Sequence, residues 1–352
     1  MIQKETYSLE NIKRIREKYN VDPELAQRAV FALGLVEALV KAGTQFVFKG
    51  GSSLMILFEV PKRLSTDVDI LVEPNYDIET HIKKVAEIFP FISYEESIRK
   101  TNKSISKKHF KINYKSPRTN RKVVVLLDVL FAKNRYKKLE QKEIKNDLLI
   151  CRGDNLLVNI PSIEEMLADK LTAFAPHTIG INFYNSDFSN DKRLEVIKQF
   201  YDVSKLFDLA KDFALVKATY YEAAFEEIAF RDLKISPEDC LYDSFETALT
   251  IFSWGKFHKE DFDNCLNGIK KIESHILSEK FNLNTAYMPA AKVMLLAVAI
   301  LHDVNPFEID IAKNEIIKNP PYNQINKIKR IQPEAFDIAS QAIELMNENK
   351  RK

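Results

Sequence analysis

Glycine is scarce in this chain: only 8 of its 352 residues are glycine, whereas an average protein contains about 7%. Long apolar runs are missing too, and the longest, "VMLLAVAIL" at residues 293–301, is too short to span a bilayer. The first twenty residues, "MIQKETYSLENIKRIREKYN", lack the continuous apolar stretch of a secretory signal. We therefore expect neither export nor membrane insertion.

Cysteine is also rare. Cys151, Cys240 and Cys265 are too widely separated for a zinc-binding motif or a disulfide framework. With 45% hydrophobic residues, 29% charged residues and a net charge of +2, the composition is that of an ordinary globular protein. These features predict a protein of the reducing cytoplasm. The length favours two domains or one elaborated domain.

The apolar pattern predicts a sheet in the first half of the chain and helices in the second. Residues 22–42 have apolar positions at helical spacing, with Asp22 as the N-cap and Pro23 at the first helical position. The strands "TQFVF" and "DVDILVE" then enclose a turn and a helix, "SSLMILFE". After a helix around residues 77–89, "KHFKINYKS" and "RKVVVLLDVLFAK" flank "PRTN" as an antiparallel hairpin.

Helices dominate the remaining sequence. A helix is predicted at about residues 162–175, another from about Asp191 to Lys211, and a largely helical pattern continues to the end. We therefore predict an α+β fold, in which a small mixed sheet with helices is followed by an all-helical C-terminal region. The expected parts are N-terminal helices at 1–45, a sheet core at 46–160, helices that complete the site at 161–212, and a helical domain at 213–352.

Two of the few glycines, Gly50 and Gly51, stand side by side where the first strand must turn into a helix. Such a turn exposes backbone N–H groups at the helix start, and the hydroxyls of Ser52 and Ser53 add further donors. The pattern is typical of a phosphate-binding turn. A tight turn with a serine N-cap accounts for the same residues equally well.

Asp67 and Asp69 follow at a spacing of two. Residues two apart on a strand point to the same face, so both carboxylates project together while Val68, Ile70 and Val72 point to the core. Magnesium prefers oxygen ligands and commonly links one or two carboxylates to substrate phosphates. The pair therefore predicts a magnesium site for phosphoryl transfer. The alternative is two solvated aspartates at the start of a strand.

A third carboxylate, Asp128, interrupts the otherwise apolar run "VVVLLDVLF". A buried carboxylate without a partner is costly, so Asp128 is expected to face a compensating group. A metal shared with Asp67 and Asp69 is the simplest candidate. The alternative is an acid at a strand end.

Lys170 lies in the middle of an apolar helical stripe. A lysine on a buried face either extends along its stem to water or meets an anion, and a triphosphate held at the Ser52 turn would satisfy it. Its charge would then offset negative charge that develops during transfer.

Positive charge is concentrated between Arg99 and Lys122, where ten residues are lysine or arginine and none is acidic. His109, Phe110 and Tyr114 are interleaved with these cations. A nucleic-acid backbone is attracted by clustered cations, which makes this stretch a candidate RNA-binding hairpin through Lys103, Lys107, Lys108 and Lys111. Such a run is equally well explained as a solvated, charged face.

The motifs "GGSSL" and "RLSTDVD" and the later strand aspartate together resemble the nucleotidyltransferase fold of the DNA polymerase β type. More narrowly, "ADKLTAF" and "KQFYDVSKLF" resemble the lysine motif and the Arg-Asp-x-Tyr-Asp-like motif of the AbiEii/AbiGii-type toxins. The resemblance covers about residues 30–212. Lys198 and Gln199 depart from the family pattern, in which an arginine and an acid are common at these positions.

The resemblance implies a role for each matching residue. Asp67, Asp69 and Asp128 would hold Mg²⁺; Gly50, Gly51, Ser52, Ser65 and Lys170 would bind a nucleoside triphosphate; and Asp202 would join Lys170 and the three aspartates in catalysis. The implied reaction transfers a nucleoside monophosphate to an acceptor hydroxyl, in particular the 3′ end of tRNA, and an antitoxin protein would restrain it. Two alternatives remain open: a small-molecule or protein acceptor, and a catalytically idle module that binds nucleotide or RNA.

Overall fold

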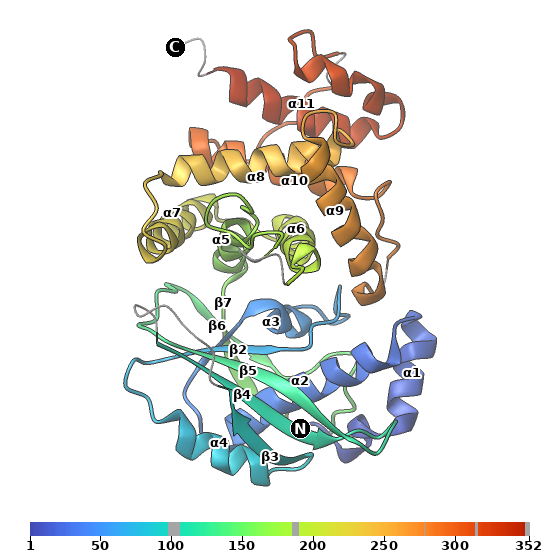
Figure 1. Cartoon of the computed structure of the whole chain (residues 1–352), viewed down its shortest axis with the longest axis vertical. Helices are drawn as coiled ribbons and strands as arrows, with labels where there is room; N and C mark the ends of the chain where they lie inside the picture. Colours follow the sequence, from blue (N-terminus) through green and yellow to red (C-terminus); the bar gives the residue numbers. More distant parts are fainter. Residues whose placement is uncertain (98–105, 185–189, 278, 314–315, 349–352) are drawn as a thin grey trace. The chain divides into compact units, whose positions relative to one another are not determined.

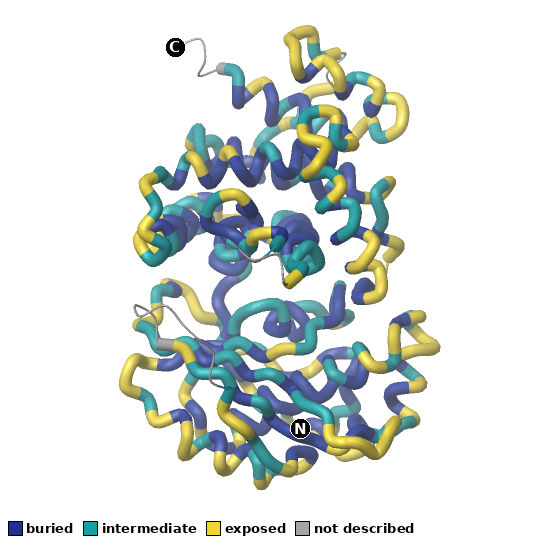
Figure 2. The backbone as a smooth tube through the Cα atoms, viewed as in Figure 1, coloured by how far each residue is buried: buried dark blue, intermediate teal, exposed yellow. Residues whose placement is uncertain are grey.

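The computed structural model describes residues 1–97, 106–184, 190–277, 279–313 and 316–348 (Figure 1). The chain forms two compact units. Unit 1 comprises Met1–Ser162 and Ser274–Glu279, and unit 2 comprises Ile163–Glu273 and Lys280–Lys352. Buried residues concentrate in the interior of each unit (Figure 2). Unit 1 contains the sheet and unit 2 is helical.

The described part of unit 1 contains a seven-stranded sheet with the order β3-β4-β5-β2-β1-β7-β6. Two neighbouring pairs, β2 with β5 and β1 with β7, are parallel, and the other pairs are antiparallel. The strands are β1 (Val47–Lys49), β2 (Val68–Val72), β3 (Phe91–Glu96), β4 (Ser106–Lys115), β5 (Lys122–Phe131), β6 (Leu139–Glu143) and β7 (Leu157–Pro161). The predicted mixed sheet is confirmed.

Helices α2 (Pro23–Lys41) and α4 (Ile78–Glu87) cover one face of the sheet. Asp22 caps α2 by accepting a hydrogen bond from the Glu24 N–H, as the sequence predicts. Phe31 of α2 stacks on Tyr114 of β4 with the ring centroids 3.7 Å apart, so the residues that alternate in register with Tyr114 face these helices. The residues on this face include Val68, Ile70, Phe110, Leu127 and Val129, each at most 1% exposed.

Three further elements complete the helical part of unit 1: the 3₁₀ helix η1 (Lys4–Tyr7), α1 (Leu9–Tyr19) and α3 (Gly50–Leu57). Helix α3 follows β1 directly and contacts β1 and β2. The predicted order of strand, turn, helix and strand is therefore confirmed. The turn between β1 and α3 is fixed relative to β2 because β1 pairs with β2 and α3 contacts both strands.

One segment of unit 1 comes from far along the sequence. Residues Ser274–Glu279, hereafter the return segment, begin within the 3₁₀ helix η2 (Glu273–His275). The Leu64 N–H donates to the His275 carbonyl at 2.7 Å, and the Leu277 N–H donates to the Lys62 carbonyl at 3.1 Å. The return segment thus pairs with the loop that leads to Asp67.

Unit 2 is built from α5 (Ile163–Ala173), α6 (Arg193–Phe207), α7 (Phe213–Phe230), α8 (Pro237–Phe252), α9 (Lys259–Ile272), α10 (Tyr287–His302), η3 (Tyr322–Arg330) and α11 (Pro333–Glu348). Helix α10 is apolar on nearly all sides, which suits its position in contact with α6, α8 and α11. Helix α8 begins with a capping box between Ser236 and Asp239. Among the described residues, no helix has both the length and the apolarity needed to cross a membrane.

Candidate active site

The turn between β1 and α3 can be built only with glycine. Gly50 has a φ of +78°, and a Cβ there would overlap the carboxylate of Asp69. Position 50 therefore excludes a side chain on both conformational and steric grounds. At Gly51, a Cβ would lie 2.7 Å from Nη2 of Arg63 and 2.9 Å from Oγ of Ser65. The two glycines allow an aspartate, an arginine and a serine to approach the turn.

The serines of the turn are buried and bonded to backbone. The Ser52 hydroxyl donates to the Asp67 carbonyl, and the Ser53 hydroxyl donates to the Gly50 carbonyl at 2.9 Å. Ser52 therefore links the glycine turn to the loop that contains Asp67, which we call the aspartate loop. The predicted hydrogen bond from Ser52 to a phosphate stays a prediction. The N-cap residue Lys49 makes no side-chain cap bond to α3.

A row of four residues crosses the sheet beside this turn. Lys49 of β1 is in register with Asp69 of β2, Asp69 with Asp128 of β5, and Asp128 with His109 of β4. Residues in register point to the same face of a sheet, and this face is opposite to the one that α2 and α4 cover. We call it the aspartate face.

The three aspartates differ in their surroundings, and the predicted joint projection of Asp67 and Asp69 stays a prediction. Asp69 is half-buried, and Val68 and Ile70 on either side are buried on the opposite face. Asp67 is exposed and lies one residue before β2, with its Oδ1 3.4 Å from the Thr66 hydroxyl. Asp128 is also half-buried and directly neighbours Asp69. The structure thus brings Asp69 and Asp128 together from two strands.

The carboxylates suit a hard cation in donor type but do not form a complete cage. Among the described residues, no group of three or more histidine, cysteine, aspartate or glutamate side chains is placed to hold a metal ion. Mg²⁺ often uses only one or two carboxylates and completes its shell with water and substrate phosphates. The pair of Asp69 and Asp128 fits that requirement, and Asp67 lies next to it on the chain.

His109 is a residue of this site that sequence reasoning did not assign. Its Nδ1 lies 2.6 Å from Oδ1 of Asp128. The hairpin turn contains the signal that could have found it, because pairing Lys115 with Lys122 places His109 opposite Asp128 by counting six residues along each strand. Arg63 was also missed, although it stands in the same motif as Ser65 and Asp67.

Lys170 and Asp202, which the resemblance implicates in catalysis, lie in unit 2 and form an ion pair. Nζ of Lys170 on α5 lies 2.9 Å from Oδ2 of Asp202 on α6, and it donates to Oε1 of Gln199 at 3.1 Å. Both charged side chains are buried. The anion that a lysine on this apolar stripe requires is therefore supplied by the protein itself, and Gln199, one of the two residues that depart from the family pattern, takes part.

The four lysines of the candidate RNA-binding hairpin differ in their surroundings. Lys108 pairs with Glu79 of α4 and lies 3.9 Å from Glu96, so it points away from the aspartate face. Lys107 and Lys111 alternate with it and share the face of His109. Lys103 lies outside the described residues. The stretch from Arg99 to Lys122 contains no acidic residue, but Glu79 and Glu96 from other parts of the chain compensate the positive charge of Lys108.

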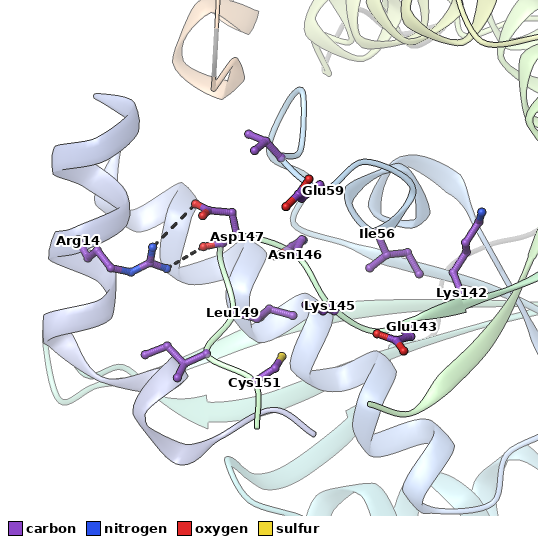
Figure 3. Close-up of a pocket in the computed structure, with 12 residues that line it drawn as sticks. Arg14, Ile56, Glu59, Lys142, Glu143, Lys145, Asn146, Asp147, Leu149 and Cys151 are labelled. Atoms are coloured by element: carbon purple, nitrogen blue, oxygen red, sulfur yellow. Dashed lines mark hydrogen bonds and ion pairs between the residues drawn. The ribbon is translucent and has the colours of Figure 1, made fainter. Parts of the chain in front are cut away.

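A separate cavity of about 660 Å³ in unit 1 is lined by none of the aspartates of the candidate site (Figure 3). Arg14 points toward Asp147 across it, with Nη2 of Arg14 donating to the Asp147 carbonyl at 2.8 Å. Its three basic residues are matched by three acidic ones, Glu59, Glu143 and Asp147. A triphosphate requires an excess of positive charge, so this cavity is a poor match for one.

The comparison with protein families decides the class of the protein. The family model described as "Nucleotidyl transferase AbiEii toxin, Type IV TA system" matches residues 35–282, which is more than half of the chain. The chain belongs to the AbiEii family. It is therefore a nucleotidyltransferase of a toxin family, as the motif resemblance predicts. The match runs through β1–β7 and α5–α9 and ends just after the return segment.

No curated protein matches the chain. Among solved structures, JHP933 from Helicobacter pylori is 14% identical, with a TM-score of 0.45 over 78% of this chain and 92% of that one. A putative nucleotidyltransferase from H. pylori is 13% identical, with a TM-score of 0.46 over 81% and 99% of the two chains. An antigenic nucleotidyltransferase-like protein from Paracoccidioides brasiliensis is 13% identical, with a TM-score of 0.37 over 61% and 95%. The assignment to the family rests on the family model and not on these three structures.

Proposed function

We propose that the protein is a magnesium-dependent nucleotidyltransferase toxin that transfers a nucleoside monophosphate from a triphosphate to the 3′ end of tRNA. The observation that carries the proposal is the cross-strand pair of Asp69 and Asp128 beside the turn that begins at Gly50. Paired carboxylates beside the N–H groups at the start of a helix can supply metal and phosphate ligands at one place. The family supports the reaction class.

The chain's own groups have distinct tasks in this reaction. The N–H groups at the start of α3 bind the triphosphate, with Arg63 and Ser65 beside Gly51 as further donors. Asp69, Asp128 and Asp67 hold the metal. When bound, Mg²⁺ stabilises the charge that develops on the phosphoryl oxygens. The acceptor hydroxyl loses its proton to water as its oxygen forms a bond to the α-phosphorus, the bond from the α-phosphorus to the bridging oxygen breaks, and pyrophosphate leaves.

The second part of the proposal concerns the ion pair in unit 2. The resemblance assigns Lys170 to the nucleotide and Asp202 to catalysis, and the distance of 2.9 Å between their charged groups supports a shared role. Ser52 supports the reaction through its bond to the Asp67 carbonyl, which fixes the aspartate loop relative to the turn.

The biological setting is proposed from the family. Addition of nucleotides to a tRNA 3′ end blocks aminoacylation, so growth would stop, as in abortive infection, and a separately encoded antitoxin would restrain the enzyme. A cytoplasmic location agrees with three free cysteines, Cys151, Cys240 and Cys265.

The proposal is tested with purified protein, Mg²⁺ and each of the four labelled nucleoside triphosphates, with total RNA and fractionated tRNA as acceptors. We expect at least one nucleotide to label tRNA, and we expect chelation of the metal or Asp128→Asn to abolish labelling. Absence of label in any RNA, together with equal growth of cells that express wild type and Asp69→Asn, would overturn the tRNA proposal.

A small-molecule or protein acceptor is the second candidate. It is favoured by the acids that surround the hairpin cations, since Lys108 pairs with Glu79 and Lys122 lies 2.7 Å from Glu95. The same assay with RNA-free lysate discriminates the two. Label in a protein band or a small-molecule fraction, with none in RNA, supports this second acceptor class.

A further inference from the structure

His109 and Asp128 are in close side-chain contact on the aspartate face. Nδ1 of His109 lies 2.6 Å from Oδ1 of Asp128, a short distance for a hydrogen bond with a nitrogen donor. The imidazole side chain is only 11% exposed, whereas the Asp128 side chain is 37% exposed. The histidine is thus enclosed, and the aspartate faces outward from it.

We propose that His109 is a positioning residue that orients the Asp128 carboxylate for binding a divalent cation. This inference rests on the proposed function and adds a residue to its metal site. His109 acts through Asp128 and not by contact with substrate. Outer partners of this kind orient metal ligands, and their loss typically costs about 10–100-fold in metal affinity or activity.

The hydrogen bond with His109 uses one of the two carboxylate oxygens of Asp128. A carboxylate in its ionised form only accepts hydrogen bonds, so in the proposed arrangement the Nδ1–H of His109 donates a hydrogen bond to Oδ1 of Asp128. Among the described residues, Oδ1 has this donor and Oδ2 has no hydrogen-bond partner. One oxygen is therefore held by the imidazole, and the other remains available to a cation.

The backbone around His109 is rigid enough to hold this orientation. His109 lies within β4, which pairs with β3 on one side and with β5 on the other. Its carbonyl accepts a hydrogen bond from the Ser97 N–H at 2.7 Å. Because His109 and Asp128 are also cross-strand partners, the contact joins two neighbouring strands of one sheet and does not depend on a loop.

Two substitutions of His109 test the inference, and both keep a polar side chain at this position. In His109→Asn the side-chain amide nitrogen occupies the place of Nδ1 and can still donate to Asp128, whereas in His109→Gln the amide lies one bond farther out. Binding of Mn²⁺, followed by electron paramagnetic resonance without any acceptor, gives a readout independent of catalysis. The concentration of Mg²⁺ that half-saturates transfer gives a second readout.

The chain offers a matched control in His81 of α4. Its Nε2 lies 2.9 Å from the Tyr76 hydroxyl and its Nδ1 lies 3.0 Å from the Ala42 carbonyl, so it is hydrogen-bonded at both nitrogens without contacting an aspartate of the site. His81→Gln makes the same chemical change in the same unit. We expect it to leave Mn²⁺ binding unchanged.

The expected result is a loss of about 10–100-fold in Mn²⁺ affinity for His109→Gln, with affinity close to wild type for His109→Asn and with turnover recovered in His109→Gln at high Mg²⁺. Equal Mn²⁺ affinity in the two His109 variants, whether high or low, would overturn the inference. Failure of the proposed function is distinguishable: wild type and Asp128→Asn would then bind Mn²⁺ equally or not at all.

Discussion

Gly50 is the residue at which the backbone conformation and the candidate site depend on each other most directly. Its φ is +78°, and a Cβ at this position would overlap the Asp69 carboxylate. We predict that Gly50→Ala costs about 1–2 kcal/mol of unfolding free energy through the left-handed backbone. It should also displace Asp69 and strongly reduce nucleotide transfer. Denaturant unfolding and the transfer assay measure the two effects.

Gly43 provides the control for this prediction. It has a φ of +77°, and a Cβ there would meet no atom within 4 Å. Gly43→Ala therefore carries the backbone cost without the steric conflict, and its transfer rate should match wild type. If the two variants reduced activity to the same extent, backbone strain and not the displacement of Asp69 would be responsible.

The buried pair of Lys170 and Asp202 leads to a second prediction. Removing one member of a buried ion pair leaves the other charge without compensation, which typically costs about 3–5 kcal/mol. We expect Asp202→Ala to destabilise the protein by this amount, and we expect Lys170→Met in the same background to recover part of the stability. A double-mutant cycle measured by denaturant unfolding tests this, and additive effects would contradict it.

At the residue scale, the sequence constrains the direction of the acids better than it constrains their contacts. A period of two and an apolar run each limit where the carboxylates of Asp69 and Asp128 can point, and their roles as metal ligands stay a prediction. The contact of His109 with Asp128 depends on the register between two strands, which no single segment contains. The bond of Ser52 to the Asp67 backbone likewise depends on how the loop closes.

The lysines of strand β4 lie on two different faces of the sheet, so their contributions to RNA binding can be tested separately. Lys107 and Lys111 lie on the aspartate face, and Lys108 pairs with Glu79 on the other. If the acceptor is RNA, we predict that changing Lys107 and Lys111 to glutamine weakens RNA binding. The slope of log K against log salt should fall by about 1 for each lysine that binds a phosphate in the wild type. RNA binding measured across a salt series gives both quantities.

Lys108→Gln is the matched control for this prediction. It removes an exposed ion pair that is worth about 0–1 kcal/mol and should leave RNA binding and its salt slope unchanged. Equal effects of Lys108→Gln and the double substitution would mean that the whole hairpin contributes through its net charge. No effect of either would argue against an RNA acceptor held by β4.

The start of α6 and the end of α9 are linked through Asp191. Arg193 donates to Asp191 from Nε at 2.9 Å and from Nη2 at 2.8 Å, and Lys271 of α9 pairs with the same carboxylate. The hydrogen bonds from Arg193 are the main cause that lowers the pKa of Asp191 below its usual value, and Lys271 adds to them.

The lowered pKa of Asp191 gives a pH-dependent prediction. A carboxylate with a lower pKa in the folded state stabilises the protein above its unfolded pKa, and that contribution disappears as pH falls toward the folded value. Asp191→Asn should therefore unfold at a lower temperature than wild type at pH 7, with a difference that shrinks below about pH 4. A difference that is independent of pH would contradict a role for the ionised group.

At the scale of elements, strong local signals predicted α2 and the hairpin of β4 and β5. These segments combine a clear period with capping or turn residues. Strands β3, β6 and β7 were not predicted. The five residues of β6, "LEQKE", alternate partly buried and exposed positions at an edge of the sheet, where a strand needs little apolar character. Their identity as strands comes from pairing with neighbours.

At the scale of the whole molecule, each unit has its own core, but the chain enters unit 1 twice. The return segment bonds to residues 62–64 just before the aspartates. We predict that Leu277→Pro, which removes the N–H that donates to Lys62, weakens Mn²⁺ binding by the aspartates. Leu277→Ala keeps that N–H and reduces only packing, so it should bind Mn²⁺ more tightly than Leu277→Pro. Titration of Mn²⁺ into both variants tests this, and equal affinities would contradict it.

Because the return segment lies at residues 274–279, unit 1 is not complete when residue 162 leaves the ribosome. The loop before Asp67 receives its last backbone partner only after about a hundred further residues have been translated, which takes several seconds or more at roughly 5–20 residues per second. The nascent chain therefore lacks these two backbone hydrogen bonds to residues 62–64 until the return segment has been translated. If the loop needs this support to hold the metal, the proposed activity arises only after the return segment has been translated.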